Sequence, residues 1–161
     1  MTLKERIESC SKCPLRAKLT EFEKPVFGVG SNKPKVMIVI DNNTSESLFL
    51  IDGLKLEYLE KNLVKYKINK SDLYITPLVK CARKTTVKSF KECRDWLREE
   101  IEEFRPKLVI LISAFNISEY SSFTINEIIW YKISLNKLAN STAEDKKYTD
   151  TIFTKIKEHC A

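Results

Sequence analysis

The sequence predicts an α/β fold in which a mostly parallel β-sheet lies between two layers of helices. Two short apolar runs, 35–41 and 107–113, are almost uninterrupted and rich in β-branched residues. Such runs are typical of strands buried on both faces, because a sheet covered by helices on both sides needs no polar face. Amphipathic segments at helical spacing separate the runs, as right-handed β–α–β connections require.

The composition is that of an ordinary globular protein, and we expect residues 1–161 to form one domain. Of the 161 residues, 43% are hydrophobic and 31% are charged, which argues against a disordered or fibrous chain. No apolar run approaches the roughly 18 residues of a membrane-spanning helix, so we expect no membrane association. The charged N-terminus lacks the apolar core of a signal peptide, and we therefore expect the cytoplasm.

The net charge of +6 comes from 28 Lys and Arg against 22 Asp and Glu. A positive surplus suits polyanionic partners, although it also serves solubility. On charge alone, we consider nucleic-acid binding a somewhat better explanation of the positive net charge than solubility.

The first segments place a helix and a loop before the first central strand. Residues 2–9 predict a short helix, in which Thr2 is the N-cap and Glu5 completes a capping box. Residues 18–34 carry Gly, Pro and mixed charge and predict a loop. Strand 35–41 follows this loop.

A helix and a second strand come next. Leucines at helical spacing predict an amphipathic helix over 53–66. Residues 73–79 predict a strand, but Pro77 has no amide proton, so we expect the strand to be irregular or edge-like there.

The next helix begins after Ser89, which we expect to cap it, and ends at Arg105 and Pro106. Its apolar side chains share one face with Cys93, which is therefore expected to point inward. Strand 107–113 follows.

Beyond that strand the pattern is weaker. Residues 124–133 have the composition of a fourth strand. Ser141 and Glu144 form a second capping box, which predicts the start of a final amphipathic helix.

Five cysteines carry the clearest chemical signal. In a reducing compartment such a set is better interpreted as metal-binding or catalytic than as disulfides. Cys10 and Cys13 are spaced to bind one metal or cluster, Cys81 ends the second strand, and Cys93 lies on the next helix. By itself the first pair leaves zinc, an iron–sulfur cluster and a redox dithiol open. Cys160 has no partner in this scheme.

Polar residues follow two of the predicted strands. Ligands bind outside the carboxyl ends of strands in open α/β sheets, which favours the loop that begins at Asp41. A solvated turn explains that loop equally well. The predicted loop 82–88, which follows Cys81, is basic and rich in hydroxyls, as is typical of segments that contact phosphates. The candidate DNA contacts are Lys80, Arg83, Lys84, Thr85, Thr86 and Lys88.

Taken in order, these motifs resemble the family 4 uracil-DNA glycosylases, the iron–sulfur branch of that superfamily. The pair Cys10 and Cys13, followed by Pro and Leu, is similar to the family's opening Cys-x-x-Cys-x-Leu. Residues 25–30 look like its Val-Phe-Gly-x-Gly segment. Residues 74–81 match its Tyr-Ile-Thr-Asn-x-x-Lys-Cys signature at every fixed position except the asparagine, and residues 92–97 look like the helix that carries its fourth cysteine.

The resemblance runs from residue 7 to 115 and implies a three-layer α/β/α fold with a four-stranded, mostly parallel sheet. It also implies a 4Fe-4S cluster. The implied cluster ligands are Cys10, Cys13, Cys81 and Cys93. The alternative occupant of these four thiolates is zinc.

The resemblance breaks at the positions that carry catalysis in the family. The family's Gly-Glu-Ala-Pro-Gly loop, which holds uracil and positions water, aligns with residues 40–44, where Ile40 replaces glycine. The family's asparagine, which reads the Watson–Crick edge of flipped uracil, aligns with Pro77, which has no side-chain donor or acceptor. The family's stacking aromatic aligns with Phe49. The remnants of the ligand pocket are Asp41, Asn42, Asn43, Phe49 and Pro77.

The family also has a His-Pro-Ser segment, whose histidine stabilises charge developing on uracil. The sole histidine here is His159, close to the end of the chain and not followed by Pro-Ser. Loss of one such contact typically costs about 100- to 1000-fold in rate, and at least three contributors are changed here.

We therefore expect a glycosylase-like scaffold without glycosylase activity. Its expected role is binding, of DNA or of a protein partner, in a replication, repair or transcription assembly. The size and the Lys/Asn/Ile-rich composition are consistent with a viral or plasmid origin, in which case the expected location is the host cytoplasm. The alternatives are an active divergent glycosylase in which Asp41 activates water, and a four-cysteine zinc module in a nucleotide-binding α/β domain.

Overall fold

The computed structural model describes seven parts of the chain. They are residues 1–10, 28–40, 54–78, 80, 87–112, 128–131 and 145–160.

Within the described residues, a five-stranded sheet runs through the centre of the molecule in the order β1-β3-β2-β4-β5. Neighbouring strands are parallel except for β1 and β3, which are antiparallel. The mostly parallel sheet is therefore confirmed. The strands are β1 (Val29–Gly30), β2 (Val36–Ile40), β3 (Leu73–Pro77), β4 (Leu108–Ile112) and β5 (Ile128–Tyr131).

Strand β1 is one strand more than expected, because it lies in the segment 18–34 that we predicted to be a loop. It has two residues, too few for a pattern of alternating side chains to be visible. Gly30 lies at φ 129°, and a Cβ atom there would come within 2.2 Å of the Leu73 carbonyl oxygen. Glycine at this position therefore allows β1 to pack closely against the start of β3.

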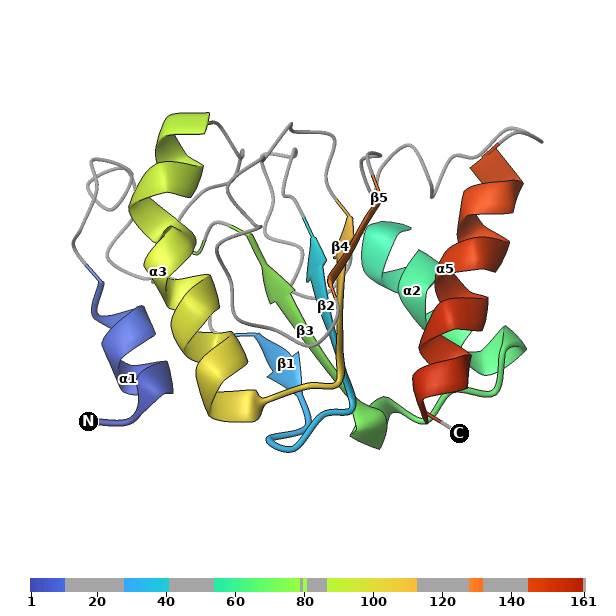
Figure 1. The fold of residues 1–161 in the computed structure, drawn as a ribbon, viewed down its shortest axis with the longest axis horizontal. Helices are drawn as coiled ribbons and strands as arrows, with labels where there is room; N and C mark the ends of the chain where they lie inside the picture. The colour runs from blue at the N-terminus through green and yellow to red at the C-terminus, as the bar shows by residue number, and fades with distance from the viewer. Residues whose placement is uncertain are drawn as a thin grey trace.

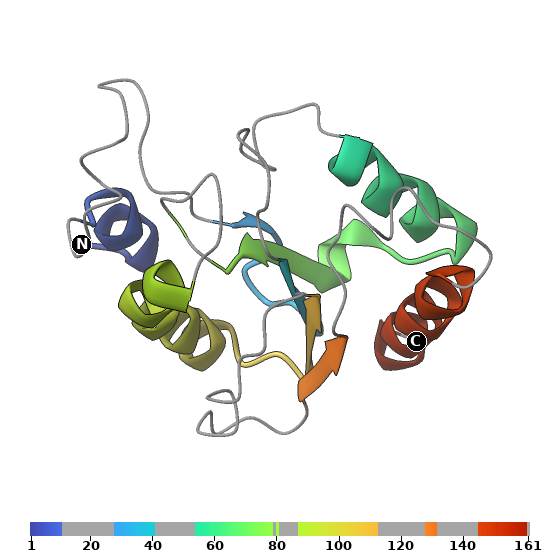
Figure 2. The same ribbon diagram turned by 90° about the horizontal axis from the view of Figure 1, so that it is seen from above.

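Four α-helices within the described residues cover the sheet. On one face lie α1 (Leu3–Glu8) and α3 (Val87–Phe104), and on the other lie α2 (Leu54–Lys65) and α5 (Asp145–Cys160) (Figures 1 and 2). This arrangement is the expected three-layer α/β/α fold. Among the described helices, none is long and apolar enough to cross a membrane.

The capping box expected at the first helix is present. The Glu5 amide donates to Thr2 Oγ1 at 3.1 Å, and the Thr2 amide donates to a Glu5 carboxylate oxygen at 2.8 Å. The box expected at Ser141 and Glu144 lies outside the described residues.

Helix α3 begins earlier than expected and ends where expected. Ser89 lies inside the helix, which starts at Val87, so the prediction that Ser89 is its cap is wrong. The chain leaves α3 through Arg105, whose φ of 45° is left-handed, and Pro106 then prevents continuation of the helix.

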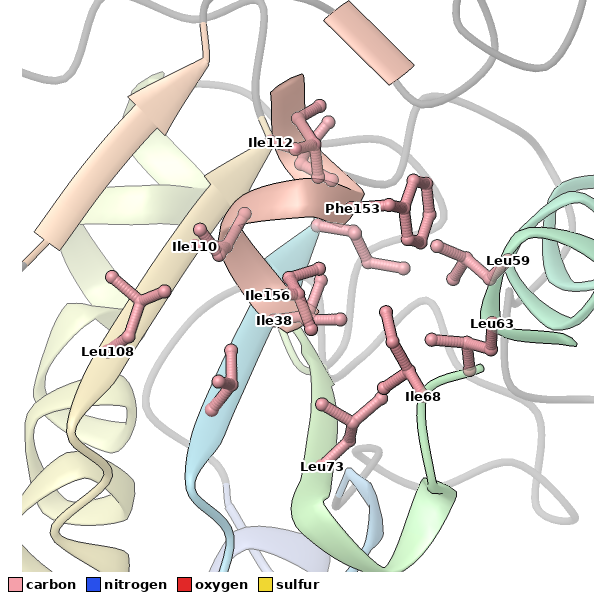
Figure 3. Close-up of a cluster of buried hydrophobic side chains, with 13 residues drawn as sticks. Ile38, Leu59, Leu63, Ile68, Leu73, Leu108, Ile110, Ile112, Phe153 and Ile156 are labelled. Carbon is pink, nitrogen blue, oxygen red and sulfur yellow. The ribbon is translucent and has the colours of Figure 1, made fainter. Parts of the chain in front are cut away.

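The sheet separates two apolar cores, because successive strand residues point to opposite faces. Beneath α1 and α3, one core includes Met37, Val39 and Leu97. Beneath α2 and α5, side chains of β2, β3 and β4 meet those of both helices (Figure 3). The labelled members are Ile38, Leu59, Leu63, Ile68, Leu73, Leu108, Ile110, Ile112, Phe153 and Ile156.

Strand β3 accommodates Pro77 because the backbone nitrogen of Pro77 faces the side of the strand on which no hydrogen bond is needed. The Leu78 amide donates to the Ile40 carbonyl at 2.8 Å, and backbone donors alternate between the two edges of a strand. The amide position of Pro77 therefore faces the β1 side, where the described pairing ends at Ile75. This one-sided pairing agrees with the expected edge-like character at Pro77.

Candidate functional site

The carboxyl ends of the four parallel strands lie side by side and form one edge of the sheet. Ile40 of β2 is in register with Pro77 of β3 and with Ile112 of β4, and Ile112 is in register with Tyr131 of β5. Ligands of open α/β sheets bind at such an edge. Among the five expected pocket remnants, the structure describes Pro77, whereas Asp41, Asn42, Asn43 and Phe49 lie outside the described residues.

At this edge, the end of β3 offers no side-chain hydrogen-bonding group to a ligand. Pro77 is buried and has neither a side-chain donor nor an acceptor. Its carbonyl oxygen accepts a hydrogen bond from Lys80 Nζ at 2.9 Å. The adjacent position on β2 is Ile40, which is also fully buried and apolar. These two neighbours can supply shape to a ligand but no side-chain hydrogen bond.

Lys80 does not belong with the expected DNA contacts. Its side chain has no exposed surface, and its ammonium group forms an ion pair with Glu100 and donates to Thr76 Oγ1 at 2.5 Å. A phosphate cannot reach a lysine that is held inside the protein. The other candidates remain expectations, because 81–86 lie outside the described residues and the Lys88 side chain is not described.

Glu100 is the centre of a buried polar cluster that the sequence analysis missed. Tyr74 Oη donates to Glu100 Oε2 at 2.5 Å, and Thr76 Oγ1 donates to the same oxygen at 2.8 Å. The Gly28 amide in turn donates to Tyr74 Oη at 3.0 Å. Burial, and secondarily the Glu100 charge, raises the pKa of the Tyr74 phenol. A signal was present, since Glu100 has the helical spacing of the inward face of α3.

Cys10 lies at the contact between α1 and α3. It is buried, and its Sγ accepts a hydrogen bond from Trp96 Nε1 at 3.1 Å. Arg6 forms an ion pair with Glu99 across the same contact, at 2.7 Å. Cys93 precedes Trp96 by about one helical turn on α3. The structure therefore brings Cys10 to the part of α3 that carries Cys93.

The remaining parts of the predicted metal centre are not described. Cys13 and Cys81 lie outside the described residues, and the Cys93 side chain is not described. Within the described residues, no three His, Cys, Asp or Glu side chains gather in a way that could hold a metal ion.

The two residues set aside by the sequence analysis lie at the opposite edge of the sheet. The Cys160 carbonyl accepts from Lys35 Nζ at 3.3 Å, and Lys35 precedes the first residue of β2. His159, beside Cys160, contacts the Lys155 carbonyl through Nδ1 at 3.1 Å. Burial, and secondarily Asp72, raises the pKa of the Cys160 thiol. His159 thus lies next to a residue that contacts the amino end of β2, and not at the carboxyl edge of the sheet.

Comparison with known proteins agrees with this architecture. Residues 27–154 match the family model of the uracil DNA glycosylase superfamily. The chain belongs to this superfamily. A type-4 uracil-DNA glycosylase from Archaeoglobus fulgidus is similar, with 28% identity over 118 residues, which cover 68% of this chain and 57% of that protein. The resemblance to family 4 is therefore confirmed, and this superfamily member spans just over half of the relative's length.

Proposed function

We propose that this superfamily member is an iron–sulfur, DNA-binding protein that does not excise uracil. In this proposal it acts as an accessory subunit of a replication, repair or transcription assembly. The observation that carries the proposal is the pairing of Pro77 with Ile40 at the carboxyl edge of the sheet. Two neighbouring positions that supply base readout and a tight loop in family 4 are hydrocarbon in this chain.

The missing hydrogen-bonding group at Pro77 weakens both the binding of a flipped base and the stabilisation of the transition state for its excision. A site built to hydrogen-bond a flipped base needs donors and acceptors that are already in place. The Pro77 side chain supplies none, and the carbonyl that could substitute is bonded to Lys80. The only histidine, His159, lies at the other edge of the sheet.

The cofactor in this proposal is a 4Fe-4S cluster held by Cys10, Cys13, Cys81 and Cys93. The described geometry suits it, because Cys10 faces α3 about one turn from Cys93 and accepts a hydrogen bond from Trp96. Hydrogen bonds to cysteine sulfur tune and support such clusters. When bound, the cluster would cross-link the thiolates and supply redox capacity.

The DNA-contacting residues in this proposal are Arg83, Lys84, Thr85 and Thr86, which lie in sequence between Lys80 and α3, and Lys88 in the first turn of α3. Lys80, just before these residues, lies shortly after the carboxyl end of β3. The N-terminus of α3 returns to the same edge (Figure 1), where its backbone dipole favours a phosphate.

A uracil-release assay on single- and double-stranded uracil-containing DNA tests the loss of activity. We expect no release above the uncatalysed background, and release at enzyme-like rates would overturn the proposal in favour of a divergent active glycosylase. The type-4 enzyme of Archaeoglobus fulgidus serves as the positive control.

DNA binding is tested by titration of labelled DNA over a range of salt concentrations. We expect Lys84→Ala to weaken binding similarly on all sequences and to reduce the salt slope by about one ion. Lys61→Ala, at an exposed position on α2, is the matched control. Equal effects of the two substitutions would contradict the assignment of the loop.

Metal analysis of protein purified without oxygen tests the cofactor. We expect a brown protein with about four irons per chain. A colourless protein that contains zinc would replace the cluster with the four-cysteine zinc alternative.

A further inference from the structure

Four polar side chains form a closed cluster between the sheet and α3, where an apolar core would be expected. Tyr74, Thr76, Lys80 and Glu100 are all between 0% and 2% exposed. Tyr74 and Thr76 donate to one Glu100 oxygen, and the Lys80 ammonium pairs with the other. Lys80 also donates to Thr76 and to the Pro77 carbonyl.

Such a cluster needs an explanation beyond stability. Removing two opposite charges from water is costly, so a buried ion pair is often no better than apolar side chains of the same volume. The advantage of a buried polar cluster is geometric. Hydrogen bonds and ion pairs fix the direction and distance between groups, whereas apolar contacts allow side chains to shift relative to one another.

The polar cluster connects the residue before Cys81 with α3, the helix that carries Cys93. Lys80 is bonded covalently to Cys81, and its ammonium reaches Glu100 on α3. Cys93 and Glu100 are seven residues, about two turns, apart on that helix. Backbone pairing holds the chain just before this point, since the Leu78 amide donates to Ile40 at 2.8 Å. Of the described residues before Cys81, Leu78 is thus held by the sheet and Lys80 by the helix.

We propose that Lys80 and Glu100, supported by Tyr74 and Thr76, form a clamp that positions Cys81 relative to Cys93 for cluster binding. This inference rests on the proposed iron–sulfur cluster. Lys80 and Glu100 are positioning residues that act through the cysteines and do not touch the cluster. Groups that orient metal ligands typically contribute about 10- to 100-fold to metal retention.

The test compares iron release from the anaerobically purified holoprotein and from the double variant K80M/E100Q. The double variant leaves no unpaired charge, and the amide oxygen that replaces the carboxylate can still accept from Tyr74 and Thr76. We expect a ferrous chelator to remove iron about 10- to 100-fold faster from the variant. The variant K70M/E60Q is the matched control, because it removes an exposed ion pair of 2.9 Å, and we expect it to release iron at the wild-type rate.

A second reference separates positioning from a general loss of stability. Ile156→Ala creates a cavity in the core beneath α2 and α5, so it destabilises the protein without touching the clamp. At an equal loss of thermal stability, faster iron release from K80M/E100Q than from Ile156→Ala supports the clamp, and equal release overturns it.

The results also separate the clamp from the cluster itself. Iron in the wild type with wild-type release from K80M/E100Q overturns the clamp and leaves the proposed function standing. Wild-type protein that holds no iron overturns the cluster assignment and the clamp with it.

Discussion

At the scale of single residues, Lys80 and Glu100 form an ion pair without exposed surface. Lys80→Met alone leaves the Glu100 carboxylate buried with only two neutral donors, Tyr74 and Thr76. Breaking a buried pair by removing one partner costs about 3–5 kcal/mol. We expect this loss in the free energy of unfolding, measured by urea denaturation. Lys70→Met removes an exposed pair and should cost at most about 1 kcal/mol, and similar losses in both variants would contradict the buried pairing.

Tyr74 makes the free energy of unfolding depend on pH in the alkaline range. Burial and the Glu100 charge raise the pKa of its phenol, so the folded protein holds this proton above about pH 10, where an unfolded tyrosine loses it. The contribution of Tyr74 is therefore complete below about pH 10 and is lost progressively above it. Denaturation at several pH values should show Tyr74→Phe less stable than wild type at about pH 8, with a gap that narrows above about pH 10. Parallel curves would exclude this role, and Tyr148→Phe, at an exposed position, is the control.

At the scale of elements, α1 is the helix that brings Cys10 to α3. It has six residues, too few for an isolated helix to be stable in water, so its caps and its packing decide whether it forms. Thr2→Ala removes the side chain that accepts from Glu5, at a cost of about 0.5–2 kcal/mol.

Hydrogen exchange measured by mass spectrometry tests this dependence on Thr2. We expect the α1 amides to exchange about two- to thirtyfold faster in Thr2→Ala, in proportion to the lost free energy. Thr151→Ala removes a hydroxyl that bonds to the Lys147 carbonyl on α5 and should leave α1 unchanged. Unaltered exchange in α1 after Thr2→Ala would mean that packing alone holds the helix.

The elements also show how far sequence could predict the fold. Strands β2 and β4 were predicted because each is an almost continuous apolar run in the sequence, a pattern that a surface strand does not produce. The structure buries all five residues of each strand. Strand β1 was missed because pairing with β3, rather than its own side chains, makes it a strand. Its existence depends on a contact that is distant in sequence.

At the candidate site, too, some features could be predicted from the sequence and others could not. The one-sided pairing at Pro77 was predicted correctly because a missing amide proton is a property of the residue itself. Lys80 was misplaced because a lysine beside a basic loop looks the same in sequence whether it faces solvent or the interior. What decides its direction is Glu100, which is distant in sequence and reaches Lys80 from the inward face of α3.

At the scale of the whole molecule, the two cores differ in chemistry. Beneath α1 and α3, the core contains Cys10 and lies beside the Lys80–Glu100 clamp. Beneath α2 and α5, aliphatic side chains pack with Phe153, which stacks on Tyr66 at 5.6 Å between ring centroids. The described residues that we connect with the iron–sulfur cluster, Cys10 and the Lys80–Glu100 clamp, therefore lie on one side of the sheet. The core on the other side contains none of them.

This division predicts the effect of removing iron. All four proposed ligands belong to α1, α3 or the segments next to them, so cluster loss should loosen that layer first. We expect chelation to speed exchange in α1 and in the first turns of α3, and to leave α5 and β4 protected. Ile156→Ala should produce the reverse pattern, because Ile156 lies beneath α5. A uniform increase over both layers after iron removal would instead mean that the two cores unfold as one cooperative unit, in which case the cluster stabilises the whole fold rather than the layer that binds it.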